Sequence, residues 1–214
     1  MTVSNGQVNS YPEWEPHAHP AYDVILGTEC DVQLQRLRDG PSSTRREFLA
    51  DPRAVHKALY SRLTPLGYDE YAGTYRGTVG TTLASRCVAS DPFGDGPTFC
   101  FAGPEQVEKW MESARVVAER FFALDVSSSR AAVLGTAAQV FYAIGSAHPF
   151  LDGNGHIQRL AFAACIFERP NLELLDTWSI HIRPYGEEMV RALAKSDPKE
   201  KIRALSSLLA SHVL

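Results

Sequence analysis

The sequence lacks a long apolar run, a cluster of cysteines and an excess of basic residues, and each absence excludes a class of protein. The most apolar stretch covers residues 160–167, whereas a membrane-spanning helix needs about 20 apolar residues. The N-terminus has neither a basic start nor an apolar stretch, so we do not expect a signal peptide. The four cysteines form no CxxC pair, which favours buried free thiols over a disulfide framework or a zinc site. A net charge of -4 argues against a general nucleic-acid binder.

The chain is long enough to form one sizeable core. Its 214 residues are 44% hydrophobic and 21% charged, so about 70% of the unfolded chain's surface can be buried on folding. This apolar content is too high for a disordered chain. We expect residues 1–50 to form an N-terminal arm and a helix, with a regulatory role left open, and residues 51–214 to form the main domain.

Apolar periodicity predicts a mainly helical chain. From residue 104 to about residue 122, apolar residues recur at helical spacing and form one strong face. The two helices that follow are nearly apolar all round, so we expect them to be central and buried. The expected helices cover residues 21–38, 53–63, 104–122, 130–148 and 156–169, and two more begin near Pro184 and Pro198.

Residues 71–101 differ from the rest of the chain because they are rich in Gly, Thr and β-branched residues. Two short strands, near Thr78–Ala84 and Thr98–Phe101, are separated by a loop of Gly, Pro and Asp. This pattern predicts a loose β-hairpin within an otherwise helical protein.

The turn between the two apolar helices carries the chemically informative residues. Its sequence, HPFLDGNGHIQR, places Gly153, Asn154 and Gly155 where the second helix opens. Amide groups at a helix start bind phosphate, and glycines let a phosphate approach the backbone closely. Arg159, one turn into the same helix, can bind that anion with both arms of its guanidinium group. The sequence therefore predicts an anion site at this turn.

Two further side chains in the turn suit reactions of phosphates. Asp152 is a hard oxygen donor of the kind that binds Mg²⁺ beside a polyphosphate. His148 can take a proton from a hydroxyl near neutral pH. Taken singly, a Gly-Asn-Gly turn is only a helix connection, and a histidine at a helix end is often a cap. Their occurrence together within one short turn favours the interpretation as a site.

The turn resembles the motif HxFx(D/E)GNGRxxR of Fic-domain proteins. The single departure is His156, where that family usually has arginine. The resemblance extends over roughly residues 50 to 210 and implies a mainly α fold, a Fic-type helical bundle with a small β-hairpin flap over the active site. The matching residues are His148, Phe150, Asp152, Gly153, Asn154, Gly155 and Arg159.

Membership of that family would imply a protein adenylyltransferase, which moves AMP from ATP to a Ser, Thr or Tyr hydroxyl of a target protein. His148 would be the general base, and Asp152 would hold Mg²⁺ between the α- and β-phosphates. Residues 153–155 would form the anion hole, and Arg159 would contact the outer phosphates. Phe150 would anchor the turn in the core. The implied cofactor is Mg²⁺, with ATP as co-substrate.

The departure at His156 leaves three outcomes open. Losing a charge-assisted contact costs about 1.5–3 kcal/mol, but an imidazole still donates one hydrogen bond, so His156 could contact the phosphates of a less tightly bound ATP. The enzyme could instead use another phosphate-containing donor, as relatives that transfer UMP or phosphocholine do. The third outcome is a catalytically silent interaction module.

The resemblance also suggests partners. A target protein would dock along the flap by adding a strand at about Thr98–Phe101. Many Fic proteins are inhibited by a glutamate in the pattern [S/T]xxxE[G/N], which pairs with the second arginine of the motif, here Arg159. Glu47 and Glu200 match this pattern in part, and both are equally explained by helix capping. A separate inhibitory protein is the alternative. We expect a cytoplasmic protein, or one delivered to another cell as an effector.

Overall fold

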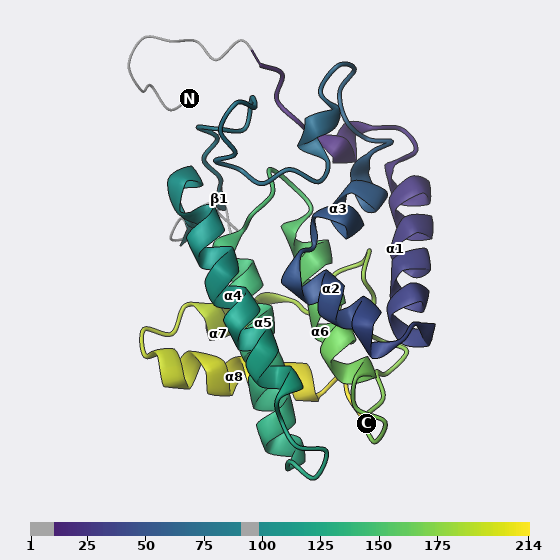
Figure 1. The fold of residues 1–214 in the computed structure, drawn as a ribbon, viewed down its shortest axis with the longest axis vertical. Coiled ribbons are helices and arrows are strands. Elements are labelled where there is room, and N and C mark those ends of the chain that lie inside the picture. Colours follow the sequence, from purple (N-terminus) through teal and green to yellow (C-terminus); the bar gives the residue numbers. More distant parts are fainter. Residues whose placement is uncertain (1–10, 91–98) are drawn as a thin grey trace.

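The two apolar helices on either side of the Gly-Asn-Gly turn form the centre of the fold. In the computed structural model, which describes residues 11–90 and 99–214, they are α5 (Arg130–Ala147) and α6 (Asn154–Phe167). Figure 1 shows both in green in the middle of a helical bundle. Eleven of the 14 residues of α6 are buried, so this helix lies in the middle of the core. The predicted burial of both helices is confirmed.

The remaining helices surround this pair on two sides. Figure 1 shows α1, α2 and α3 on one side, α7 and α8 on the other, and α4 packed along α5. Within the described residues, these helices are α1 (Tyr22–Asp39), α2 (Ser42–Ala50), α3 (Arg53–Tyr60), α4 (Val107–Phe122), α7 (Glu187–Leu193) and α8 (Pro198–Ala210). Single 3₁₀ turns lie at Pro16–Ala18, Asp69–Tyr71 and Pro104–Gln106.

Local capping explains where several helices begin. The Ser129 hydroxyl accepts the Ala132 N–H at the start of α5, and the Asp197 carboxylate accepts the Lys199 N–H at the start of α8. The predicted start of a helix at Pro198 is confirmed. The predicted start near Pro184 is wrong by three residues, because α7 begins at Glu187.

One apolar core joins the N-terminal segment to the rest of the chain. Trp14, Leu26 and Phe48 belong to the same buried cluster as the central helices. The Trp14 indole N–H also donates to the Leu63 carbonyl at 2.8 Å, which fixes the arm that precedes α1. The described part of residues 1–50 therefore contributes to folding, and its regulatory role stays a prediction.

The predicted hairpin is present only as a short antiparallel pair. Strand β1 (Ala89–Ser90) pairs with β2 (Phe99–Cys100), and the described residues contain no other strand. The first strand predicted, at residues 78–84, is wrong because this segment forms turns. The Thr78 and Thr81 hydroxyls donate to carbonyls three residues earlier, and such bonds compete with strand pairing.

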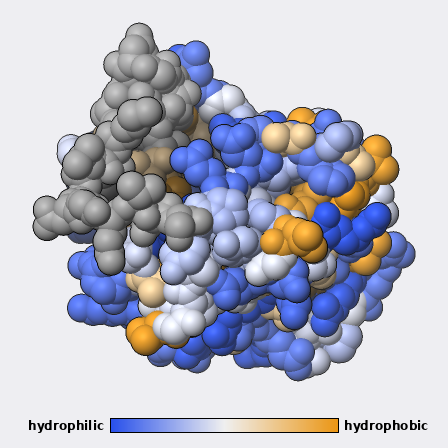
Figure 2. All heavy atoms as spheres, turned by 90° about the horizontal axis from the view of Figure 1, so that it is seen from above, coloured by the Kyte–Doolittle hydropathy of each residue, from blue (hydrophilic) through white to orange (hydrophobic). Residues whose placement is uncertain are grey.

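The surface offers no sign of a membrane span in the described part of the chain. None of its helices combines the length and the apolar character needed to cross a bilayer. Seen from above the view of Figure 1, the molecule is mainly hydrophilic, with hydrophobic residues in separate small groups (Figure 2).

Candidate active site

A cavity of about 460 Å³ lies beside the turn between α5 and α6. This volume is within the range of about 300–1,000 Å³ that is typical of small-molecule sites. Its wall includes His148, Gly155 and Arg159 of the motif, together with Arg183 and Lys201. None of the described residues that line the cavity carries a carboxylate. Three cations with no acidic neighbour in the wall make the cavity suitable for an anionic ligand.

His148 ends α5 in an unusual backbone conformation. Its φ angle of 44° is in the left-handed region, which places the imidazole at the cavity wall beyond the helix end. The ring stacks on Phe101, with centroids 3.6 Å apart. Burial lowers the pKa of His148 to about 4, and the charge of Arg76 acts in the same direction. The imidazole is therefore neutral at pH 7 and able to accept a proton.

Arg76 holds the His148 backbone in this position. Arg76 is 1% exposed, and its guanidinium group donates twice to the His148 carbonyl, at 2.7 and 2.9 Å. It also donates to the carbonyls of Arg86 and Ala102, on the two sides of the hairpin. This role was not predicted, because the carbonyls that Arg76 binds come from separate segments that only the fold brings together. We therefore regard Arg76 as a positioning residue.

Side-chain hydrogen bonds close the turn itself. The Asn154 amide both accepts the Phe150 N–H and donates to the Phe150 carbonyl, each at 2.8 Å. His56 donates to the Asp152 carbonyl and accepts the Gly73 N–H, each at 2.9 Å, while its ring stacks on Phe150. Phe150 is fully buried, as predicted for the anchor of the turn. These contacts fix the turn before any ligand is present.

The start of α6 leaves amide groups open to a ligand. No side chain caps this helix, so the N–H groups of Asn154 and Gly155 are available to an anion. Gly153 has a φ angle of 75°, and a Cβ there would lie 2.3 Å from the Tyr60 ring. A Cβ on Gly155 would approach the Arg159 guanidinium to 3.1 Å. Glycine is therefore required at residue 153 for the turn, and at residue 155 it leaves room for the arginine.

Asp152 lies at the turn but not in the cavity wall. Its carboxylate accepts the Gly153 N–H. Burial raises its pKa, while the Gly153 N–H and His17 act in the opposite direction. Because the described wall has no hard oxygen ligand from a carboxylate, the cavity in this arrangement does not fit Mg²⁺. The assignment of Asp152 as a magnesium ligand stays a prediction.

His156 also lies away from the cavity. It is 9% exposed, and its Nδ1 atom is 3.0 Å from the Tyr60 hydroxyl. Successive helical residues are rotated by roughly 100°, so His156 leaves the face that Gly155 and Arg159 share. Burial lowers the pKa of His156 to about 3, and Arg159 contributes to this shift. His156 therefore does not line the cavity, and its contact with a phosphate stays a prediction.

Several cavity residues were missed by the sequence analysis. Arg183 and Lys201 come from beyond the motif, and nothing in their local sequence distinguishes them from other surface cations. The Lys201 ammonium lies 5.3 Å from the centroid of the Tyr142 ring, which also lines the cavity. Aromatic surface from Trp110 and Tyr185 completes the apolar part of the wall. The cavity thus combines cations with flat apolar surfaces.

Neither candidate inhibitory glutamate reaches the motif. Glu47 and Glu200 are exposed, and in the described parts of the chain neither forms an ion pair with Arg159. The Arg159 Nε–H donates instead to the Ile180 carbonyl at 2.7 Å. An inhibitory role for either glutamate stays a prediction. The flap edge expected at Thr98–Phe101 is described only from residue 99 onward.

Comparison with known proteins gives a family match over the centre of the chain. A model of the Fic/DOC family matches residues 49–166, a range that includes the whole turn from His148 to Arg159. No curated protein matches the chain significantly.

Solved Fic domains share the fold. The N-terminal FIC domain of the VirB-translocated effector Bep8 from Bartonella sp. 1-1C is 17% identical, with a TM-score of 0.67, and the alignment covers 95% of this chain and 93% of that one. A Bartonella quintana Fic domain with bound ADP is 20% identical, with a TM-score of 0.57 and coverage of 93% and 89%. BepC from Bartonella tribocorum with bound AMPPNP is 19% identical, with a TM-score of 0.56 and coverage of 88% and 86%. These likenesses confirm the predicted mainly α, Fic-type fold.

Proposed function

Because this chain belongs to the Fic/DOC family, we propose that it transfers AMP from ATP to a Ser, Thr or Tyr hydroxyl of a target protein. One observation carries the proposal: neutral His148 lines the same cavity as Arg159, Arg183 and Lys201. A proton acceptor beside a group of cations is the arrangement that nucleotidyl transfer requires.

His148 acts on the attacking hydroxyl. It takes the hydroxyl proton while the oxygen forms a bond to the α-phosphorus of ATP. The bond from that phosphorus to the oxygen that bridges to the β-phosphate breaks, and pyrophosphate leaves with the bond's electron pair. Negative charge on the bound polyphosphate raises the pKa of His148 from its value in the free protein, which makes it a better base. A positioned base contributes about 10²–10⁴-fold to such a step.

The phosphates are bound by amide groups and cations. The open N–H groups at the start of α6 receive the α-phosphate, and Arg159 contacts the outer phosphates. Arg183 and Lys201 add positive charge to the same cavity and take over from the arginine that the family usually has at residue 156. The reaction depends on positioning and charge neutralisation more than on covalent help from the protein.

The apolar part of the cavity accepts the base of the nucleotide. Trp110, Tyr142 and Tyr185 offer flat surfaces against which a purine can pack. Two of the related Fic domains were solved with ADP or AMPPNP bound, which supports a nucleotide ligand here. ATP is therefore the donor that we propose first.

The target protein approaches over the hairpin. Phe101, directly after β2, stacks on His148, so a chain added along β2 would bring its hydroxyl near the base. We propose the edge at about Thr98–Phe101 as the docking strand. An inhibitory partner protein and delivery to another cell stay predictions.

A second candidate function is transfer from another donor by the same residues. The side chain of His156 is absent from the cavity wall, and the usual arginine is missing, so the phosphate contacts differ from the family pattern. This difference favours transfer of UMP or phosphocholine as the alternative to AMP.

Labelling distinguishes these possibilities. The purified chain is incubated with ATP labelled at the α- or the γ-phosphate, with α-labelled UTP and with CDP-choline labelled on its choline, each with and without Mg²⁺. We expect self-labelling or target labelling from α-labelled ATP, none from γ-labelled ATP, and its loss in His148→Ala. Label from UTP or CDP-choline alone identifies the second candidate. No label from any donor, with no measurable binding, would leave a silent interaction module.

A further inference from the structure

Three side chains that commonly bind metals meet on the side of α6 away from the cavity. Cys30 lies in α1, His156 in the first turn of α6, and His181 in the segment between α6 and α7. The Cys30 sulfur and one ring nitrogen of each histidine all lie within 4.8 Å of one another. Cys30 is fully buried and His156 nearly so. His156 lies 126 residues after Cys30 in the sequence and His181 lies farther still, yet the fold brings all three into one compact group.

Each histidine uses one ring nitrogen and leaves the other without a partner. His156 Nδ1 is 3.0 Å from the Tyr60 hydroxyl, and His181 Nε2 is 3.0 Å from an Asp23 carboxylate oxygen. His156 Nε2 and His181 Nδ1 are buried and have no hydrogen-bond partner in residues 11–90 and 99–214. A buried polar atom without a partner costs about 1–3 kcal/mol, so two of them together need an explanation.

We propose that Cys30, His156 and His181 bind one Zn²⁺ ion. A thiolate and two neutral imidazoles form a ligand set that Zn²⁺ prefers, and tetrahedral coordination leaves a fourth position for water or another small ligand. The hydrogen bonds from the far ring nitrogens to a tyrosine and a carboxylate are those that orient histidine ligands in zinc proteins. The scattered cysteines predicted no zinc site because the ligands come from three separate segments.

One face of α1 packs against these histidines and contributes to the proposed zinc site. Asp23, Gly27 and Cys30 are spaced so that they share one side of the helix. A Cβ added to Gly27 would lie 3.7 Å from the His181 Cδ2 atom, so the imidazole packs directly against this side. The exposed Asp23 carboxylate accepts a hydrogen bond from the His181 ring, and Cys30 supplies the sulfur.

Binding of the ion releases a proton. A cysteine binds metal as the thiolate, whereas a free thiol is protonated at neutral pH, so the metal-free site holds a thiol. The Zn–S bond forms as the thiol proton passes to solvent. Zinc affinity should accordingly rise with pH.

The ion would tie the cavity wall to α1. Ile180, next to His181, accepts the Arg159 Nε–H, and Arg183 lines the cavity two residues farther on. A metal at His181 thus restrains the segment that contains Arg183 and that accepts a hydrogen bond from Arg159, two of the cavity's cations. His156, the one departure from the family motif, supplies a ligand here that an arginine cannot supply.

Metal binding to the tag-free full chain tests the site directly. After treatment with a chelator, the protein is titrated with Zn²⁺ by calorimetry in two buffers of different ionisation enthalpy, and with Co²⁺ in a spectrophotometer. We expect one ion per chain, release of one proton, and a near-ultraviolet band from thiolate-to-cobalt charge transfer. Cys30→Ser and His156→Arg should lose the tight site and the band. Cys165→Ser, which removes another fully buried thiol outside the group, should keep both.

Thermal unfolding separates loss of the site from loss of the fold. Zn²⁺ should raise the melting temperature of the wild type and of Cys165→Ser but not that of His181→Gln, which changes a half-buried ligand and keeps Cys30. Circular dichroism checks that each variant is folded. A wild type that binds no zinc after chelation, or a folded Cys30→Ser or His156→Arg variant that retains the cobalt band, would overturn the proposal. Neither result depends on the proposed transferase activity.

Discussion

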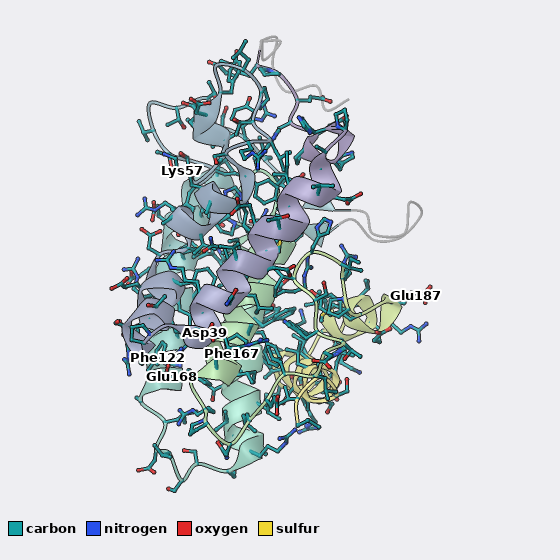
Figure 3. All side chains as sticks on the ribbon, turned by 90° about the vertical axis from the view of Figure 1, so that its right-hand side faces the viewer. Asp39, Lys57, Phe122, Phe167, Glu168 and Glu187 are labelled. Carbon is teal, nitrogen blue, oxygen red and sulfur yellow. The ribbon has the colours of Figure 1, made fainter. Side chains whose placement is uncertain are left out.

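The two ends of α6 carry similar polar residues but use them differently. At the C-terminal end, Arg169 donates to the carbonyls that end α4, and Glu168 accepts from Arg45 and Ser42. Arg45 also donates to the carbonyls that end α1. Figure 3 shows Phe167 and Glu168 at this lower end of the bundle, near the ends of α1 and α4, whereas α3 with Lys57 lies in the upper part.

At the N-terminal end of α6, polar groups are left available. The helix has no side-chain cap, and Arg183 and Lys201 form no ion pair among the residues that the structure describes. His156 keeps one buried ring nitrogen without a partner. Most polar groups at the C-terminal end are paired and stabilise the bundle, although Arg169 Nε has no partner among the described residues. The uncapped amides and unpaired cations at the N-terminal end are the groups that we expect to bind ligands.

Removal of the base should have the largest effect. We expect His148→Ala to lower the rate of AMP transfer by about 10²–10⁴-fold, because the attacking hydroxyl loses its proton acceptor. The rate of label incorporation measures this loss, with His19→Ala, at an exposed position, as the matched control. A His148→Ala rate within twofold of the wild type would show that another group is the base.

Arg76 lies near the N-terminal end of α6, where we propose that the reaction occurs, but its guanidinium group is fully paired. Arg76→Met should lower the free energy of unfolding by about 2–5 kcal/mol, because buried carbonyls of His148, Arg86 and Ala102 lose their donor. Denaturant titration measures the change. Arg76→Lys should recover part of the stability and less of the activity, because a lysine cannot reach all three carbonyls. Equal stability of Arg76→Met and wild type would contradict this role.

Acid should destabilise the fold through its buried histidines. The pKa of His56 and that of His156 are lowered to about 3 and that of His148 to about 4, each chiefly by burial, against about 6.5 in an unfolded chain. The unfolded state therefore binds more protons below about pH 6.5, so stability is complete above that pH and falls as pH drops toward the folded-state values. Urea midpoints at about pH 7 and about pH 5 measure the fall. His156→Gln should reduce this pH dependence, and an unchanged dependence would argue against buried, neutral histidine at that position.

The smallest effect is expected at the C-terminal end of α6. Glu168→Gln should cost about 1 kcal/mol of stability, since a neutral acceptor replaces a charged one opposite Arg45. The rate of AMP transfer should not change, because this residue lies at the end of α6 remote from the cavity. A large loss of activity in a Glu168→Gln variant of unchanged stability would contradict the proposal that only the N-terminal end of α6 takes part in the reaction.

The sequence predicted those features that depend on neighbouring residues. Helical periodicity located the central helices, and the cap at Asp197 with Pro198 located the start of α8. The motif brought His148, Gly155 and Arg159 to one cavity, as expected from a helix start.

The features that the sequence did not reveal depend on contacts between distant segments. Arg183 and Lys201 join the cavity, and Cys30 meets His181, only because α1 packs on α6, α8 packs on α5 and α7 packs on α8. The first strand of the hairpin was misplaced because Thr78 and Thr81 favour turns through their own hydroxyls. The motif also does not reveal side-chain direction, and the helix turns His156 away from the cavity.

The most direct measurement is calorimetry of ATP binding to the wild type, to Arg159→Gln and to Glu168→Gln. If the N-terminal end of α6 binds the phosphates, Arg159→Gln should weaken binding by roughly 10- to 150-fold, the loss of one charge-assisted contact of about 1.5–3 kcal/mol, while Glu168→Gln binds as the wild type does. Equal affinities in all three proteins, or no binding to the wild type, would contradict the assignment of this end of the helix as a nucleotide site.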